Sequence, residues 1–306
     1  MFEERPFPKI PPSAGIVLPV GVVAISFASI FIKLCDAPPL IIAAYRLTLA
    51  TVILLLWTLP RRRNWADLRF LNIRDVLASL LAGLFLCFHF AFWITSLRYT
   101  SVASSVIFVT TNPIFVALIS LFLFREKLSA ALLGSILLAV AGGILIGWED
   151  WNKGDVGLTG DLLALLGALM ASGYLLTGRR VRQRMELRLY ITLVYATASF
   201  FLMLLAWVSG DPFFDYPLQT YLLLFLIALV PQLIGHTCLN WALKFFSATL
   251  VAVFILGEPI GATTLAYFIL GEPLSGELVA GPAQHPVGLG VVYKPLRRRV
   301  PLQSPA

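Results

Sequence analysis

Charged side chains are scarce in this chain of 306 residues. Asp, Glu, Lys and Arg together make up 13% of it, whereas a soluble domain normally carries about 25%. Long polar stretches are scarce as well, because 59% of the residues are hydrophobic and the mean hydropathy is +0.88. This composition excludes an ordinary soluble enzyme and indicates an integral membrane protein.

Further absences exclude other classes of protein. The sequence contains no GxxxxGK[ST] motif for ATP, and no nucleophile–base set that would predict catalytic residues. Its three cysteines, Cys35, Cys87 and Cys238, have no metal-like spacing and are interpreted as small apolar residues. The basic residues are not gathered on one domain face, so no nucleic-acid partner is expected. We therefore predict a protein that is not an enzyme and has no metal site and no cofactor.

What the chain does have is a series of long apolar runs. A helix needs roughly 20 apolar residues to cross the hydrocarbon core of a bilayer. We predict an all-α integral membrane protein with ten transmembrane helices, at 16–34, 39–59, 76–97, 102–124, 131–147, 159–178, 189–209, 220–243, 248–270 and, more weakly, 277–293. The first run is assigned as a helix because no small-residue cleavage site and soluble region follow it.

The loop charges predict an orientation in the membrane. If the N-terminus is cytoplasmic, 19 of the 23 Lys and Arg residues fall in cytoplasmic segments. The opposite loops carry acidic residues such as Asp150, Asp211 and Asp215. By the positive-inside rule, both termini are expected in the cytoplasm, with the protein in the inner membrane as a multi-pass protein.

The sequence also contains an internal repeat. Residues 92–129 match residues 238–275 without gaps at an offset of 146, and the match includes Pro113 with Pro259 and the expected helix N-caps Ser101 and Ser247. This offset covers five helices, an odd number, so the second copy must enter the membrane from the opposite side. We predict two inverted five-helix repeats, at 16–147 and 159–293, followed by a basic cytoplasmic tail at 294–306. Inverted repeats are typical of secondary transporters.

Prolines interrupt the fourth and ninth spans near their middles. Pro113 and Pro259 each remove a backbone donor and free carbonyl groups at membrane depth, so both are predicted helix-break hinges. The freed groups need polar neighbours or water. Thr110, Thr111 and Asn112 lie right beside the first break, and Thr111 and Asn112 are the candidates for lining a cavity.

The position equivalent to Asn112 is occupied by Glu258. A charged residue at a helix centre costs about 3 kcal/mol on insertion scales, so this carboxyl group should face the interior or a wet cavity. Glu258 either binds a cationic substrate group or exchanges a proton, or it is a neutral carboxyl hydrogen-bonded between helices. Arg46, about two turns into the second span, is either a cavity charge or an interhelical strut.

Polar and aromatic residues in other spans extend the candidate site. Span eight has a polar stripe expected to face the cavity, formed by Gln232, His236 and Asn240. His236 and the similarly placed His89 are also expected to form helix–helix hydrogen bonds. Four large aromatic residues could stack on a substrate, although packing is their commoner use: Tyr45, Trp93, Tyr174 and Trp241.

The paired stretches NPIFVALISLFLFREKLS and EPIGATTLAYFILGEPLS resemble the EamA family of the drug/metabolite transporter superfamily. The resemblance implies a permease or exporter of small metabolites, often amino acids or their analogues, with a central cavity between the two halves. The family positions that match here are Pro113, Glu126, Glu258, Pro259 and Glu272. The tail departs from the family pattern, because prolines and polar residues interrupt the expected tenth span.

We therefore expect a secondary-active transporter that works by alternating access, driven by a proton or substrate gradient. Its expected partners are a small-molecule substrate, protons and the lipid bilayer, and no sequence signal defines an oligomeric state. Two alternatives remain open: a non-transporting membrane scaffold or regulatory subunit and, less favoured, a membrane-embedded enzyme.

Overall fold

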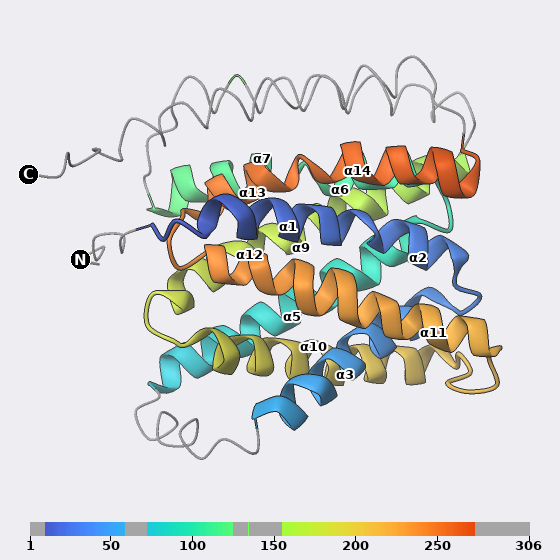
Figure 1. Ribbon diagram of the computed structural model, residues 1–306, viewed down its shortest axis with the longest axis horizontal. Helices are drawn as coiled ribbons and strands as arrows, with labels where there is room; N and C mark the ends of the chain where they lie inside the picture. The colour runs from blue at the N-terminus through green and yellow to red at the C-terminus, as the bar shows by residue number, and fades with distance from the viewer. Residues whose placement is uncertain (1–9, 59–71, 125–133, 135–154, 273–306) are drawn as a thin grey trace, which may run out of the picture.

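The computed structural model describes residues 10–58, 72–124, 134 and 155–272, and the regular structure of these residues is helical throughout (Figure 1). This confirms the predicted all-α class. Within the described residues, eight helical stretches are long and apolar enough to cross a membrane: Ala14–Leu34, Pro39–Trp57, Ile73–Ser96, Val102–Phe122, Gly157–Arg182, Leu187–Ser209, Leu218–Ala242 and Ala248–Leu270. The predicted spans 131–147 and 277–293 lie outside the described residues.

Several spans are divided into shorter helical elements. In the first four they are α1 (Ala14–Ser26) with α2 (Ala28–Leu34), α3 (Pro39–Thr58), α5 (Ile73–Ser96), and α6 (Val102–Val109) with α7 (Asn112–Ile119) and η2 (Ser120–Phe124). In the other four they are α9 (Asp155–Arg182), α10 (Leu187–Ser209), α11 (Leu218–Ile227) with η3 (Ala228–His236) and α12 (Thr237–Ala242), and α13 (Ala248–Ile255) with α14 (Glu258–Leu265) and η4 (Ala266–Leu270). The η elements are π-helices, which are wider than α-helices and are often found at functional sites.

Both predicted boundaries of the sixth span differ from the structure by a full turn, since this span is predicted to begin at 159 and α9 begins at Asp155. The sixth predicted span ends at 178, whereas α9 continues to Arg182. The basic side chain of Arg182 is buried, and its Nε donates to the carbonyl oxygen of Asn240 at 3.0 Å. Because the Arg182 side chain donates to this neighbouring backbone carbonyl, it can stay buried in the last turn of α9 and does not have to lie in the following loop.

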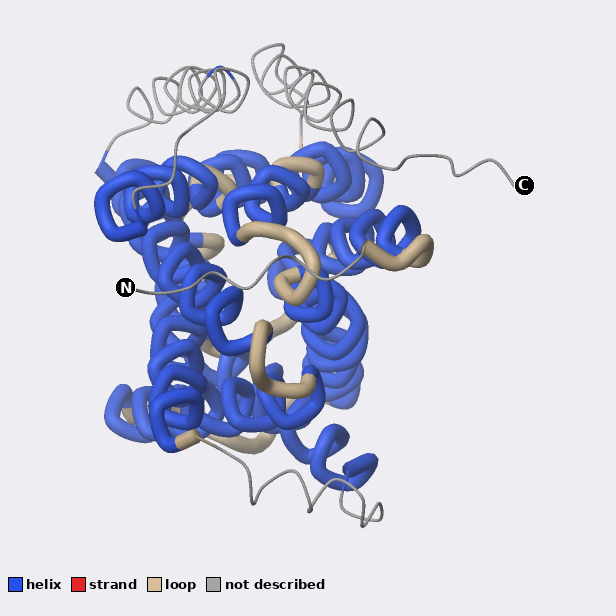
Figure 2. Tube along the Cα trace, turned by 90° about the vertical axis from the view of Figure 1, so that its left-hand side faces the viewer, coloured by secondary structure: helices blue, strands red, loops and turns tan. Residues whose placement is uncertain are grey.

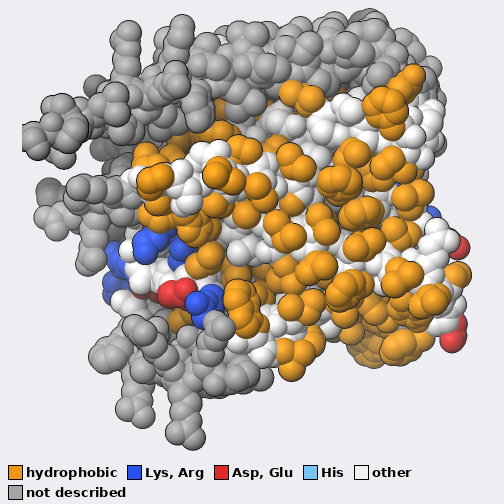
Figure 3. All heavy atoms as spheres, viewed as in Figure 1, with side chains coloured by type: hydrophobic (Ala, Val, Ile, Leu, Met, Phe, Trp, Pro, Cys, Tyr) orange, Lys and Arg blue, Asp and Glu red, His pale blue; other side chains and the backbone are white. Residues whose placement is uncertain are grey.

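Apolar side chains cover the outside of the helices (Figure 3). Phe122, Phe268 and Trp207 have exposed fractions of 79%, 77% and 71%. Charged side chains in Figure 3 gather at the two ends of the molecule, and the band between them is predominantly hydrophobic. A broad apolar surface between two polar ends is what a bilayer covers. These features belong to a multi-pass membrane protein.

The helices form a bundle, seen end-on in Figure 2. α5 packs along α9, α3 packs along α10, and α1 packs on η3 and α12. Glycines allow two of these contacts. A Cβ atom on Gly21 of α1 would lie 2.8 Å from the Cβ of Cys238, and one on Gly167 of α9 would lie 3.3 Å from the Cβ of Trp93. Gly21 and Gly167 stand 146 positions apart, the offset of the sequence repeat.

The two broken spans pack against each other in opposite directions. α6 contacts α14, and α7 contacts α13. Because α6 precedes α7 and α13 precedes α14, the two spans run antiparallel and cross at their breaks. The predicted breaks are present, and each proline lies in the first turn of the second half-helix. A proline is tolerated there because the first-turn N–H groups have no intrahelical partner.

Candidate functional site

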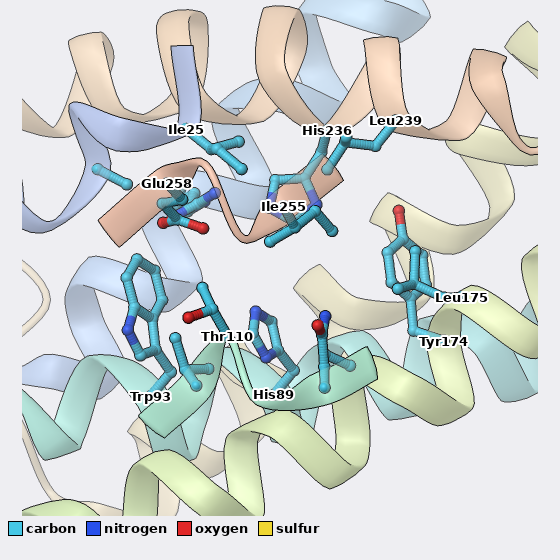
Figure 4. Close-up of a pocket in the computed structure, with 15 residues that line it drawn as sticks. Ile25, His89, Trp93, Thr110, Tyr174, Leu175, His236, Leu239, Ile255 and Glu258 are labelled. Atoms are coloured by element: carbon cyan, nitrogen blue, oxygen red, sulfur yellow. The ribbon is translucent and has the colours of Figure 1, made fainter. Parts of the chain in front are cut away.

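A small cavity lies where the two broken spans cross (Figure 4), and its surface is mostly apolar although several polar residues contribute to the lining. Its volume is about 40 Å³, which is room for about three water-sized groups. Polar and aromatic side chains from six spans line it: Arg46, His89, Trp93, Thr110, Asn112, Tyr174, His236 and Glu258. Apolar side chains complete the wall, among them Ile25, Val109, Leu175, Leu239 and Ile255.

Glu258 enters the cavity from the first turn of α14. Its exposed fraction is 7%, and Figure 4 shows its carboxyl group pointing toward the side of the cavity where Trp93 and Thr110 lie. A negative charge in the first turn of a helix is stabilised by the helix dipole. The Arg46 guanidinium acts on this carboxyl group electrostatically. A carboxyl group and a guanidinium group therefore line the same cavity.

Asn112 occupies the equivalent place on the other broken span. Its exposed fraction is 3%, and its backbone carbonyl accepts a hydrogen bond from the Ser172 hydroxyl at 3.1 Å. The backbone carbonyl of Glu258 accepts in the same way from the Ser26 hydroxyl, at 3.4 Å. Ser26 and Ser172 are again 146 positions apart. Sequence reasoning overlooked both serines, although the repeat offset relates them.

Arg46 is fully buried on α3, with an exposed fraction of 0%. Its Nε donates to Oε1 of Gln232 at 2.8 Å, and its guanidinium carbon lies 4.0 Å from the centroid of the Phe90 ring. Neither Nη nitrogen has a hydrogen-bond partner among the described residues. Arg46 therefore combines the two predicted alternatives: its Nε forms an interhelical strut, and the residue also lines the cavity.

The π-helix η3 places Gln232 against Arg46. Pro231 lies inside this element and cannot donate a backbone hydrogen bond. The wider turn alters which side chains share a face of the helix. Gln232 is consequently buried on Arg46, and His236 lines the cavity one turn later.

The two histidines and a tyrosine form another part of the wall. His89 Nδ1 and the carbonyl oxygen of Gly167 are 2.9 Å apart, which confirms the predicted helix–helix hydrogen bond for His89. The ring centroids of His89 and His236 are 6.4 Å apart, and the two rings approach from opposite sides in Figure 4. Asn240 lies behind the cavity wall, where its Nδ2 donates to the Tyr174 hydroxyl. Among the described residues, no three His, Cys, Asp or Glu side chains are grouped as metal ligands would be.

Besides Asn240, three predicted site residues lie outside the lining of this cavity. The Thr111 hydroxyl donates to the carbonyl of Phe108 at 2.7 Å, and the neighbouring Thr110 lines the cavity instead. The Tyr45 hydroxyl donates to the carbonyl of Phe213 at 2.7 Å, and the Trp241 ring packs on Phe245 with centroids 4.7 Å apart. Thr111, Tyr45 and Trp241 are thus absent from the cavity lining.

A larger pocket of about 260 Å³ lies beside the connection between α2 and α3. Lys33, Asp36 and Arg98 line it, and Lys33 Nζ donates to the carbonyl of Thr100 at 3.1 Å. Burial raises the pKa of the Cys35 thiol in this pocket to about 12. The first transmembrane stretch, α3 and α5 line both this pocket and the central cavity, so the two hollows follow one another along the same helices.

Nearby, the Glu272 carboxylate accepts from the backbone N–H of Val102 at 3.2 Å. This contact joins the end of η4 to the first residue of α6, and a carboxylate at a helix N-terminus is stabilised by the helix dipole. The two broken spans are therefore also connected at this end of the bundle.

Known proteins with similar sequences are transporters by name. Two from Bacillus subtilis, the uncharacterized transporters YxxF and YcxC, are 25% and 29% identical over 61% and 58% of this chain. The matches span only 60% and 57% of the lengths of those two proteins. An uncharacterized transporter from Archaeoglobus fulgidus is 26% identical over 77% of this chain and 81% of its own length.

A solved crystal structure shares the fold, with a TM-score of 0.70 at 19% identity over 95% of this chain and 99% of that one. The model of the EamA-like transporter family matches residues 13–148 and 158–284. Both matches fall on the helical stretches that form the cavity, and together they cover most of the sequence. The chain belongs to the EamA-like transporter family.

Proposed function

We propose that the protein is a secondary-active transporter that moves small metabolites, amino acids or related compounds, across the inner membrane by alternating access. The observation that carries this proposal is the cavity at the crossing of two broken, antiparallel spans, with the buried polar residues Arg46, Asn112 and Glu258 in its lining. Transporters bind their substrates at such interrupted helices near the middle of the membrane. Membership of a transporter family supports the same function.

The proposed architecture has ten helices in two inverted repeats, 16–147 and 159–293, with both termini and the basic tail 294–306 in the cytoplasm. Three pairs of residues at the offset of 146 support the repeat. Gly21 and Gly167 lie at close helix contacts, Ser26 and Ser172 bond to the two breaks, and Phe122 and Phe268 are both exposed. Two similar halves of opposite orientation can exchange conformations and open one cavity to either side.

The cavity residues have separate proposed roles. Glu258 binds a cationic substrate group or exchanges a proton, whereas Asn112, Trp93, Tyr174 and His236 contact the substrate. Asn240 holds the Tyr174 hydroxyl, and Pro113 and Pro259 mark the hinges. A cavity of about 40 Å³ is too small for a whole metabolite, so the two halves must move apart to admit one. Tyr45, Thr111 and Trp241 are not assigned a substrate contact because they lie outside the lining.

Counterflow in proteoliposomes tests this function. The purified chain is reconstituted, loaded with one unlabelled compound, and presented with the same labelled compound outside, across amino acids, nucleosides, polyamines and sugars at two pH values. A transporter gives transient accumulation of at least one compound above the level of protein-free vesicles. A non-transporting scaffold gives no counterflow for any of them, and that result would contradict the proposal.

A further inference from the structure

Arg46 keeps most of its hydrogen-bonding capacity unused. A guanidinium has five N–H donors, and the Nε donor of Arg46 is bonded to Gln232. Within the part of the chain that the structure describes, both Nη nitrogens lack hydrogen-bond partners although the side chain is fully buried. A buried charge without hydrogen-bond partners is strongly unfavourable. Glu258 of the same cavity supplies an opposite charge, but among the described residues no acceptor is hydrogen-bonded to the Nη nitrogens, which leaves these donors available to a further acceptor.

The surroundings of Arg46 hold its guanidinium in one orientation. Gln232 anchors Nε, and the Phe90 ring covers one face at 4.0 Å from the guanidinium carbon. The edge of the planar guanidinium that carries the two Nη nitrogens is left free of these two contacts. The indole Nε1 of Trp93, another cavity residue, also lacks a hydrogen-bond partner in the described ranges. Two residues with unused donors, Arg46 on α3 and Trp93 on α5, therefore line the same cavity. Gln232 positions the Arg46 guanidinium through its bond to Nε.

We propose that the substrate presents a carboxylate to this site, which the two Nη nitrogens of Arg46 bind together. This inference rests on the proposed function and narrows its substrate class. The planar guanidinium matches a carboxylate in two parallel hydrogen bonds. A cavity of about 40 Å³ has room for about three heavy atoms, the number in a carboxylate group. Ile25, Leu239 and Ile255 provide apolar contacts for the adjoining part of the substrate.

The larger pocket along the same helices has a charge that fits an anion. Lys33 and Arg98 face it with Asp36 as the acidic residue of its lining, and the nearby Glu272 carboxylate also acts on Lys33. An excess of positive charge in a hollow raises the local concentration of anions. The larger pocket and Arg46 therefore both favour a negatively charged ligand. The charge of the pocket supports the proposal independently of Arg46.

Binding of four probes with related carbon skeletons tests the proposal. L-Leucine and 4-methylpentanoate carry a carboxylate, whereas L-leucinol and 3-methylbutylamine do not. Calorimetric titration of the full chain in detergent should show binding of the first two and at least about tenfold weaker binding of the others, because only a carboxylate forms the paired charge-assisted hydrogen bonds with Arg46. Equal binding of leucinol and leucine, or failure of both carboxylates to bind, would overturn the proposal.

Two substitutions at Arg46 separate anion binding from structural support. Arg46→Lys keeps the charge but removes the paired donors, and Arg46→Gln removes both. Both should weaken carboxylate binding at least about tenfold. If Arg46→Gln does not yield folded protein, carboxylate binding by Arg46→Lys and Gln232→Leu tests the proposal instead. Gln232→Leu should weaken carboxylate binding by less than Arg46→Lys does, because it only removes the group that orients Arg46. Arg184→Gln, at an arginine with a side chain 51% exposed, is the control and should bind like the unsubstituted chain.

Counterflow separates this inference from the proposed function. If a compound without a carboxylate shows counterflow that Arg46→Lys leaves unchanged, transport stands and the carboxylate site is refuted. If carboxylates bind through Arg46 but none shows counterflow, the binding site stands and the transport function is refuted.

Discussion

The two helix breaks share a backbone arrangement and differ in the chemistry of their side chains. At both, a proline opens the second half-helix, and a serine from another span donates to the backbone of the residue before that proline. That residue is the amide Asn112 in one break and the carboxyl Glu258 in the other. The shared features build the crossing, and the difference places an acidic group on one side only.

Arg46 shows the same asymmetry. Its equivalent at the offset of 146 is Thr192, a neutral residue. Both charged residues of the central cavity, Arg46 and Glu258, thus lack a charged counterpart in the other half. The comparison implies that matched positions hold the fold together, whereas unmatched positions determine what the cavity binds.

The largest effect is expected from removing the acidic side of this asymmetry. Glu258→Gln makes the two breaks chemically alike and removes a titratable group from the cavity. Counterflow should fall by an order of magnitude or more, which corresponds to about 1.4 kcal/mol or more, and its dependence on pH should disappear. Counterflow is measured at two pH values in proteoliposomes.

The matched control is Glu272→Gln, which changes a carboxylate bonded to the N–H of Val102 outside the central cavity. It should leave the pH dependence in place. If Glu258→Gln transports as well as the unsubstituted chain and keeps its pH dependence, Glu258 has only a structural role.

A smaller effect is expected at the paired glycines, where geometry predicts unequal costs. An added Cβ at Gly21 would meet Cys238 Cβ at 2.8 Å, whereas at Gly167 it would meet Trp93 Cβ at 3.3 Å. Gly21→Ala should therefore destabilise the protein by about 1–3 kcal/mol, as overpacking does, and Gly167→Ala by less. Thermal unfolding of both variants in detergent measures this. If Gly167→Ala destabilised the protein more than Gly21→Ala, the contact of α9 with Trp93 would be the tighter of the two.

The smallest effect is expected at the paired serines. Ser26→Ala and Ser172→Ala each remove one interhelical hydrogen bond, which contributes about 0.6 kcal/mol on average in a membrane protein. Ser172→Ala should have the larger effect, because its bond is 3.1 Å long and that of Ser26 is 3.4 Å. The difference in unfolding midpoint between the two variants is the measurement. A loss of several kcal/mol at either serine would mean that a break depends on it.

The helical class, the breaks and the two serine caps could be predicted from the sequence. A proline lacks a backbone donor wherever it stands, so Pro113 and Pro259 indicate interruption without knowledge of their neighbours. Ser101 and Ser247 accept from the N–H three residues later, at 3.1 and 3.2 Å, as predicted for N-caps. These features depend on local chemistry, which the sequence contains.

The lining of the cavity could be predicted only in part. Thr111 was expected there, but the turn between α6 and α7 places Thr110 in the wall instead. Helical spacing does not continue through a break, so it cannot decide between adjacent residues. The contact of Gln232 with Arg46 depends on η3, and a wider helix has no simple period in an apolar sequence. Tyr45 and Trp241 could not be assigned because an aromatic side chain suits a cavity, a loop contact or helix packing equally well.

Accessibility of two matched cavity positions tests alternating access most directly. Val109 and Ile255 both line the cavity and stand 146 positions apart. In a chain with Cys35, Cys87 and Cys238 replaced, Val109→Cys and Ile255→Cys are each reacted with a membrane-impermeant maleimide, from either side of oriented vesicles. Both positions should react from both sides, and a transported compound should shift the two rates in opposite directions. Reaction from one side only, at rates that no transported compound changes, would contradict the account.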